Sequence, residues 1–180
     1  MMEVDDKALV QQCFKGHKKA FETLVDKYQK ILYNLAYRLT GDFDDAEDIT
    51  QCTFIKAFER LNSYNPKYKF FSWLYRIVIN ESLNLMKTKK RTETLHTYQT
   101  STEKNPEQRY LETELSDKIQ AALMQLDPQY RILILLKHFR YCSYSEIADS
   151  LDIPEKTVKS RLYTARQLLK DELIKRGSLQ

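Results

Sequence analysis

Glycine and proline are scarce in this chain, with three glycines and four prolines among 180 residues. Folds built from many turns use these two residues to make the turns, so few turns are available here. Long helices have no need of them, and the sequence is rich in the helix formers alanine, leucine, lysine, glutamate and glutamine. The sequence therefore predicts an all-α protein.

Apolar residues recur at steps of three and four in several stretches, which is the spacing of one helix face. The stretch 21–39 is followed by Gly41, where a left-handed helix cap is expected. A further helix is expected to begin at Phe70. Between Gly41 and Phe70 another helix is expected, which begins near Asp44. The spacing assigns five residues to its buried side: Ile49, Phe54, Ile55, Phe58 and Leu61.

The polar, threonine-rich stretch TETLHTYQTSTEKNPEQ interrupts this periodicity and is predicted to be a flexible linker. Helical spacing returns after it. We therefore expect two small helical domains, over residues 1–91 and 107–180, joined by a linker over residues 92–106.

The net charge is only +4, but the basic residues are concentrated in two places. One basic stretch lies at the end of the helix expected from Phe70, and the other runs from Pro154 to Arg176. Acidic residues outnumber basic ones in the stretch from Thr92 to Leu126. Two separated basic patches are typical of a protein that contacts a polyanion at two sites.

Several classes of site are disfavoured by what the sequence contains. Cys13, Cys52 and Cys142 are far apart and show no paired ligand spacing, so we predict reduced thiols and no metal site. No cofactor and no catalytic residues are predicted either. The amino terminus lacks the apolar core of a signal peptide, and no apolar run approaches the roughly 20 residues of a membrane span. A cytoplasmic protein without membrane insertion is expected.

The stretch SYSEIADSLDIPEKTVKSRLYTARQLL has the pattern of a helix-turn-helix. Ser143 and Glu146 form a predicted capping box at the start of the first helix. Asp152 occupies the corner, where a left-handed conformation and glycine are common. The inward face of the second helix is predicted to hold Val158, Leu162, Ala165 and Leu169.

The outward face of this second helix suits the major groove of DNA. Cations are expected near phosphates at Lys156, Lys159, Arg161 and Arg166. Base edges would be read by Ser160, Tyr163 and Thr164. The alternative is a plain helical hairpin with a solvated basic face.

The helix expected from Phe70 shows two distinct sides when Leu74 is placed at the centre of the buried face. The second side is predicted to hold Trp73, Arg76, Asn80, Asn84 and Lys87. A ring that stacks, amides that bond to base edges and cations that meet phosphates would suit a single strand of bases. Alternatively, Trp73 seals the edge of the domain and the cations solvate the helix end.

Three blocks together resemble the extracytoplasmic-function sigma factors of bacterial RNA polymerase. They are FFSWLYRIVINESLNLMKTKKR, the stretch from LDPQYRILILL to YTARQLL, and DAEDITQCTFIKAF. The resemblance implies a protein whose first domain captures unpaired minus-ten bases and whose second domain binds the minus-thirty-five duplex. It also implies that the loop residues Tyr64, Asn65 and Lys67 pocket a flipped base.

The resemblance further implies partners. The clamp helices of the beta-prime subunit of core polymerase would meet Asp44, Glu47, Asp48, Gln51 and Phe54. The acidic residues among these also have a simpler explanation, because carboxylates near a helix start interact favourably with the helix dipole. Promoter DNA is the second implied partner, and an anti-sigma factor, of which some are membrane-bound, is the third.

Two other classes of function are weighed against this one. A stand-alone helix-turn-helix regulator would bind duplex DNA but would not need the Trp73, Arg76 and Asn80 stripe. An enzyme could use the carboxylates of residues 44–48 to bind a metal, but no phosphate loop or nucleophile-base spacing accompanies them. We therefore predict a sigma factor and no enzymatic activity.

Overall fold

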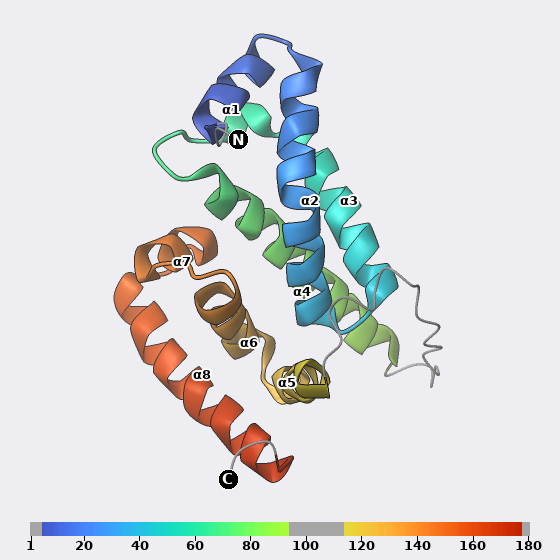
Figure 1. Ribbon diagram of the computed structural model, residues 1–180, viewed down its shortest axis with the longest axis vertical. Coiled ribbons are helices and arrows are strands. Elements are labelled where there is room, and N and C mark those ends of the chain that lie inside the picture. Colours follow the sequence, from blue (N-terminus) through green and yellow to red (C-terminus); the bar gives the residue numbers. More distant parts are fainter. Residues whose placement is uncertain (1–4, 94–113, 178–180) are drawn as a thin grey trace.

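The computed structural model describes residues 5–93 and 114–177, and these residues form helices without strands. The prediction of an all-α fold is confirmed. Figure 1 shows a first group of helices, α1 (Asp6–Phe14), α2 (Lys18–Thr40), α3 (Phe43–Glu59) and α4 (Phe70–Glu93), and a second group, α5 (Glu114–Gln125), α6 (Pro128–Ile134), α7 (Tyr144–Leu151) and α8 (Glu155–Lys175). A 3₁₀ turn (η1, Leu61–Ser63) precedes α4, and a π-helical turn (η3, Leu135–Phe139) extends α6.

The predicted domain boundaries can be compared with these helices only in part. Helix α4 continues past residue 91 to Glu93. Most of the predicted linker, 92–106, lies outside the described residues, as does the predicted start of the second domain at 107.

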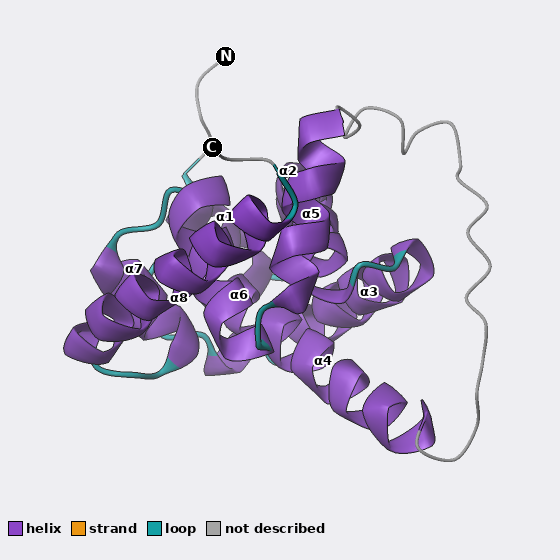
Figure 2. Cartoon of the chain, turned by 90° about the horizontal axis from the view of Figure 1, so that it is seen from below, coloured by secondary structure: helices purple, strands orange, loops and turns teal. Residues whose placement is uncertain are grey.

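Helix α2 is the centre of the first domain, since α1, α3 and α4 all pack against it. Its buried stripe includes Leu24, Leu32 and Leu39. It ends at Gly41, whose φ of 76° gives the left-handed cap that the sequence predicts and whose N–H donates to Tyr37 O at 2.7 Å. Seen from below in Figure 2, α3 and the carboxyl-terminal half of α4 lie on one side of the molecule, and α7 and α8 lie on the other.

Helix α3 packs on α2 through small side chains, which corrects one prediction. Its buried face is formed by Ala46, Ile49, Thr50, Thr53 and Ala57. The threonine hydroxyls donate to carbonyls of the preceding turn, so their burial leaves no unpaired polar atom. Ile55 and Phe58, which the spacing assigned to the core, are instead 59% and 61% exposed.

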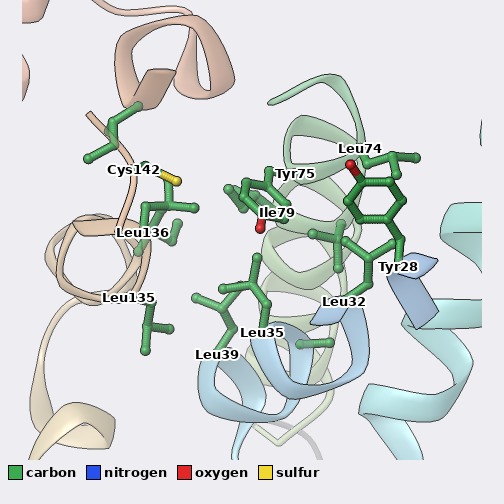
Figure 3. Close-up of a cluster of buried hydrophobic side chains, with 14 of the residues drawn as sticks. Tyr28, Leu32, Leu35, Leu39, Leu74, Tyr75, Ile79, Leu135, Leu136 and Cys142 are labelled. Carbon is green, nitrogen blue, oxygen red and sulfur yellow. The ribbon is translucent and has the colours of Figure 1, made fainter. Parts of the chain in front are cut away.

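The two helix groups share one apolar core (Figure 3). Tyr75 and Ile79 of α4 lie between the first domain and the side chains of Leu136 and Cys142 from the second. Burial raises the pKa of the Cys142 thiol to about 11, so this cysteine stays protonated and acts as a small apolar residue. Helix α4 is therefore buried on two sides, and its first half is held between the domains.

Candidate nucleic-acid interface

Helices α7 and α8 form the predicted helix-turn-helix. The capping box is confirmed: Glu146 N–H donates to Ser143 Oγ at 3.2 Å, and Ser143 N–H donates to Glu146 Oε2 at 2.8 Å. Asp152 closes α7 with a φ of 56°, the left-handed conformation expected at the corner. Helix α8 then starts at Glu155, after Pro154.

The orientation of α8 agrees with the predicted phase. Val158, Leu162 and Ala165 are buried against α5, α6 and α7. All seven residues predicted to face DNA are exposed: Lys156, Lys159, Ser160, Arg161, Tyr163, Thr164 and Arg166. This face of α8 is therefore accessible along its length, as insertion of a helix into the major groove of DNA requires.

Local contacts orient several of these side chains. Lys159 Nζ lies 2.7 Å from Glu155 Oε1 and 5.5 Å from the centre of the Tyr144 ring. Arg166 Nε donates to His138 Nε2 at 3.2 Å. Burial, followed by the nearby charges of Arg166 and Lys137, lowers the pKa of His138, which keeps the imidazole neutral and able to accept this bond.

The side of α4 predicted to bind a single strand, here called the α4 stripe, consists of Trp73, Arg76, Asn80, Asn84 and Lys87. It runs from the domain junction toward the carboxyl end of the helix. Asn80, Asn84 and Lys87 are exposed, while Trp73 and Arg76 are partly buried. The indole of Trp73 packs on aromatic rings, with centroid distances of 5.5 Å to Tyr64 and 5.6 Å to Phe70. Trp73 is thus an edge residue with one part in the core and one part at the surface.

The loop before α4 requires one correction. Tyr64, predicted to help pocket a base, is only 5% exposed, and its hydroxyl donates to Tyr68 O at 2.6 Å. Its ring supports the loop from inside because aromatic neighbours surround it. Asn65 and Lys67 are exposed, and Asn65 Oδ1 accepts a bond from Lys67 N–H at 3.0 Å, which fixes the turn.

Two residues of the loop before α4 were not among the predicted site residues. Tyr68 is exposed, and Lys69, directly before the helix, forms an ion pair with Glu146 of the second domain. The sequence offers one signal for them, since an aromatic residue and a cation directly precede the predicted strand-binding helix.

The outer face of α3 combines acidic and apolar side chains. Asp44, Glu47, Asp48 and Gln51 are exposed, and Phe54 is partly buried. Ile55 and Phe58 continue this face toward the end of the helix. Among the described residues, no group of acidic, histidine and cysteine side chains is arranged to hold a metal ion.

Comparison with known proteins identifies this arrangement of helices. Residues 24–92 match Sigma-70 region 2, and residues 116–169 match Sigma-70 region 4. The ECF RNA polymerase sigma factor SigW of Bacillus subtilis (strain 168) is 35% identical over 184 residues, covering 96% of this chain and 98% of SigW. The chain belongs to the extracytoplasmic-function sigma factors.

Two solved structures resemble this sigma factor over most of its length. The structure of CnrH in complex with the cytosolic domain of CnrY has a TM-score of 0.72 and 26% identity, covering 93% of this chain and 96% of that one. The sigma factor RpoE in complex with the anti-sigma factor NepR, from Bartonella quintana, also has a TM-score of 0.72, with 28% identity over 86% of this chain and 97% of that one.

Family membership favours the sigma-factor function over a stand-alone regulator. Sigma factors are DNA-binding proteins of transcription initiation and not enzymes. The region 2 match covers the first domain, which a stand-alone helix-turn-helix regulator would not need. Within residues 5–93 and 114–177, no helix has the length and apolar character needed to cross a membrane.

Proposed function

We propose that the exposed α4 stripe binds single-stranded minus-ten DNA when this sigma factor opens a promoter. The observation that supports this assignment best is the combination of Trp73 at the edge of the core with Asn80, Asn84 and Lys87 exposed along the same helix. A base can stack on the open part of the indole, and the amides and cation then follow the strand. Asn65 and Lys67 extend this surface through the loop.

The outer face of α8 is proposed to read the minus-thirty-five duplex. Four cations on it can contact phosphates and fix the register of the helix: Lys156, Lys159, Arg161 and Arg166. Ser160, Tyr163 and Thr164 lie between them and can reach base edges. The hydroxyls of Ser160 and Thr164 donate to carbonyls within α8, which leaves their oxygens available as acceptors.

The outer face of α3 is proposed to bind the clamp helices of core polymerase. Its acidic start suits a basic partner, and Ile55 and Phe58 give it an apolar end. By analogy with the RpoE–NepR complex, an anti-sigma factor is proposed as a second protein partner. We propose the cytoplasm as the site of action, because RNA polymerase and its promoters are there.

Trp73→Ala is expected to slow opening of a duplex promoter about tenfold, because stacking on an aromatic ring is worth about 1–3 kcal/mol per base. The measurement is run-off transcription with core polymerase on a duplex promoter and on the same promoter pre-melted at the minus-ten element. The pre-melted template should recover most of the activity. Equal losses on both templates would contradict a role in opening, and the absence of any promoter-dependent transcript with the wild-type protein would contradict the proposed function.

Lys159→Ala is expected to weaken duplex binding at all sequences and to reduce the slope of log K against log salt by about 0.9, as for one lost phosphate contact. The measurement is fluorescence anisotropy with duplex promoter DNA at several salt concentrations. Lys175→Ala is the matched control, since Lys175 also lies in α8 and pairs with a glutamate, at 2.6 Å from Glu172, but near the far end of the helix. If both variants keep the wild-type slope, Lys159 does not contact phosphate.

A further inference from the structure

The π-helical turn η3 carries two basic side chains beside the helix proposed to read duplex DNA. Such turns are rare and are often found at functional sites. The turn is closed by Arg140 N–H, which donates to Leu135 O, five residues back, at 3.1 Å. Within it, Lys137 is partly buried and His138 is exposed. Helix α6, which η3 extends, packs along α8 (Figure 1), so the turn lies next to α8.

One flank of α8 faces this turn. Lys159 and Arg166 are seven residues apart, or about two helical turns, and therefore lie on the same side of α8. Lys159 Nζ lies 5.5 Å from the centre of the Tyr144 ring, and Lys137 Nζ lies 4.7 Å from the centre of the same ring. Arg166 Nε donates to His138 Nε2 at 3.2 Å. Both cations of this flank therefore lie close to a basic residue of η3.

The flank of a helix in the major groove meets the walls of the groove. The groove is about 12 Å wide, and a helix with its side chains is about 10–12 Å across, so the helix nearly fills it. Base edges form the floor of the groove, and the phosphates of the two strands form its walls. Side chains at the centre of the inserted face reach bases, while the flanks and the elements beside them reach phosphates. The turn η3 therefore lies where the phosphates of one strand would pass.

Arg166 and His138 can bind one phosphate together. The bond to His138 uses only Nε of the guanidinium, and the two terminal nitrogens carry four further N–H donors. Neutral His138 offers Nε2 as an acceptor, but protonation turns the same nitrogen into a donor. Because the two nitrogens are 3.2 Å apart, an imidazolium and the guanidinium can donate to the two free oxygens of a single phosphate.

The surroundings of His138 favour its neutral form in the free protein. Burial first, and then the charges of Arg166 in α8 and Lys137 in the same turn, lower the pKa of His138. From α2, Arg38 adds another cation close by, because its guanidinium lies over the ring of the adjacent Phe139 at 4.3 Å. A histidine surrounded by cations stays neutral until an anion arrives.

A DNA phosphate would supply this anion. On the side of α7, the carboxylate of Glu146 is already bound to Lys69 and to Ser143 N–H. The carboxyl end of η3 also favours a cation, because the last carbonyls of a helical segment carry partial negative charge. A phosphate beside His138 would add to this effect and raise the pKa of the imidazole. Binding of duplex DNA would therefore take up a proton at His138.

We propose that His138 and Arg166 together form a phosphate-binding site for the minus-thirty-five duplex, so that the DNA contact extends from α8 to the π-helical turn. This inference rests on the proposed duplex-binding role of α8. His138 donates to the phosphate only in its protonated form. The affinity for duplex DNA therefore rises as the pH is lowered from the pKa of the bound histidine to the lower pKa of the free one, and it is level above this range.

Fluorescence anisotropy of the full-length protein with a rhodamine-labelled duplex measures this dependence. A mixed sequence of about 20 base pairs is suitable, because phosphate contacts do not depend on sequence. From about pH 8 to about pH 6, the affinity of the wild type is expected to rise about three- to tenfold, since each unit by which the phosphate raises the pKa is worth up to a factor of ten. His138→Gln should lose this rise. Glutamine can still accept from Arg166, so the variant removes the proton and keeps the acceptor.

Two further variants complete the comparison. His17→Gln is the matched control, because His17 is an exposed histidine of the first domain whose side chain makes no capping bond to α2. It should keep the pH profile of the wild type. His138→Lys carries a permanent cation and should bind at about pH 8 as tightly as the wild type binds at about pH 6, with a level profile. In NMR spectra, the imidazole signal that His138→Gln removes should titrate at higher pH when duplex DNA is present.

The possible results are distinct. A pH profile that His138→Gln leaves unchanged overturns the phosphate site, as does an imidazole signal whose titration duplex DNA does not move. Affinity that falls on acidification of the wild type, but not of His138→Gln, also overturns it, because His138 would then serve Arg166 only as a neutral acceptor. If Lys159→Ala keeps the wild-type salt slope, α8 is not the duplex-binding surface and the phosphate site is overturned with it. A reduced slope for Lys159→Ala with a pH profile independent of His138 overturns the phosphate site alone.

Discussion

Replacing Arg131 by alanine is expected to lower the free energy of unfolding of the second domain by about 3–4 kcal/mol. Arg131 is only 4% exposed and donates to three carbonyls at the end of α5, those of Leu123, Met124 and Leu126, at 2.9 to 3.0 Å. It also donates to Leu39 O, at the end of α2. The guanidinium therefore lies between the negative ends of two helices.

The cost of losing Arg131 comes from the carbonyls that remain. Burial lowers the pKa of Arg131, but arginine stays protonated in proteins, so a positive charge is held here by helix-terminal carbonyls. Alanine leaves these buried acceptors without donors, and each unpaired acceptor costs about 1–3 kcal/mol. Part of this loss is offset because the arginine no longer has to be removed from water. Lysine offers one ammonium in place of a planar fork and should recover less than half of the loss.

Urea titration followed by circular dichroism measures this change for all the helices, and the emission of Trp73, the only tryptophan, reports unfolding of the first domain. Arg131→Ala should move both transitions to lower urea, because the two domains share one apolar core and Arg131 also donates to Leu39 O of the first domain. Arg161→Ala, at an exposed arginine of α8, is the control and should change stability by less than about 0.5 kcal/mol. A similar small change for Arg131→Ala would show that the carbonyls find other donors.

The second domain shows how far sequence reasoning can reach. Its signals are local: the capping box at Ser143, the corner at Asp152 and the buried stripe through Leu162 all depend on spacing within one or two turns. The structure confirms each of them. Because the outward face of a helix follows from its inward face, the exposure of the DNA-facing residues could be predicted as well.

The face of α3 could not be predicted because hydrophobicity is a poor guide where two helices approach closely. Ala46 and Ala57 allow α2 and α3 to come together, and Thr50 and Thr53 fit there because their hydroxyls bond within the helix. A prediction of the buried face from apolar spacing gives alanine little weight and treats threonine as polar. It therefore assigned the larger Ile55 to the core, although a large apolar side chain is also what a docking surface carries.

Contacts between the domains lie beyond sequence reasoning for a different reason. Tyr75 and Ile79 give α4 a second apolar side, and such a helix is expected to be buried on both sides, but spacing does not name the partner. The partners, around Leu136, follow only after the segment 94–113 in the chain. Periodicity within a helix carries no information on pairs so distant. Arg131 was missed for another reason, because apolar spacing assigns a charged residue to the surface, whereas here its guanidinium is buried by bonds to nearby backbone carbonyls.

Ile55→Asp is expected to weaken binding to core polymerase about 100-fold without destabilising the sigma factor. Ile55 is 59% exposed and lies in the middle of the proposed polymerase-binding face, between Gln51 and Phe58. Large apolar side chains at the centre of an interface contribute about 2–4 kcal/mol, and an aspartate there adds the desolvation of a charge. The acidic residues at the start of α3 lie at the rim, where charge affects the association rate more than the affinity.

Affinity for core polymerase can be measured by competition with a fluorescent wild-type protein. Tyr141→Asp is the matched control, because Tyr141 is an exposed large side chain of the second domain. Its backbone is in the left-handed conformation, which aspartate tolerates. Glu47→Gln should instead reduce the association rate severalfold at low salt, with little change in dissociation. A sigma factor that carries Ile55→Asp and still competes like wild type would place the polymerase on another face. The exposure of Ile55 and Phe58 would then need a different partner, since two neighbouring apolar side chains left in water gain nothing for the fold.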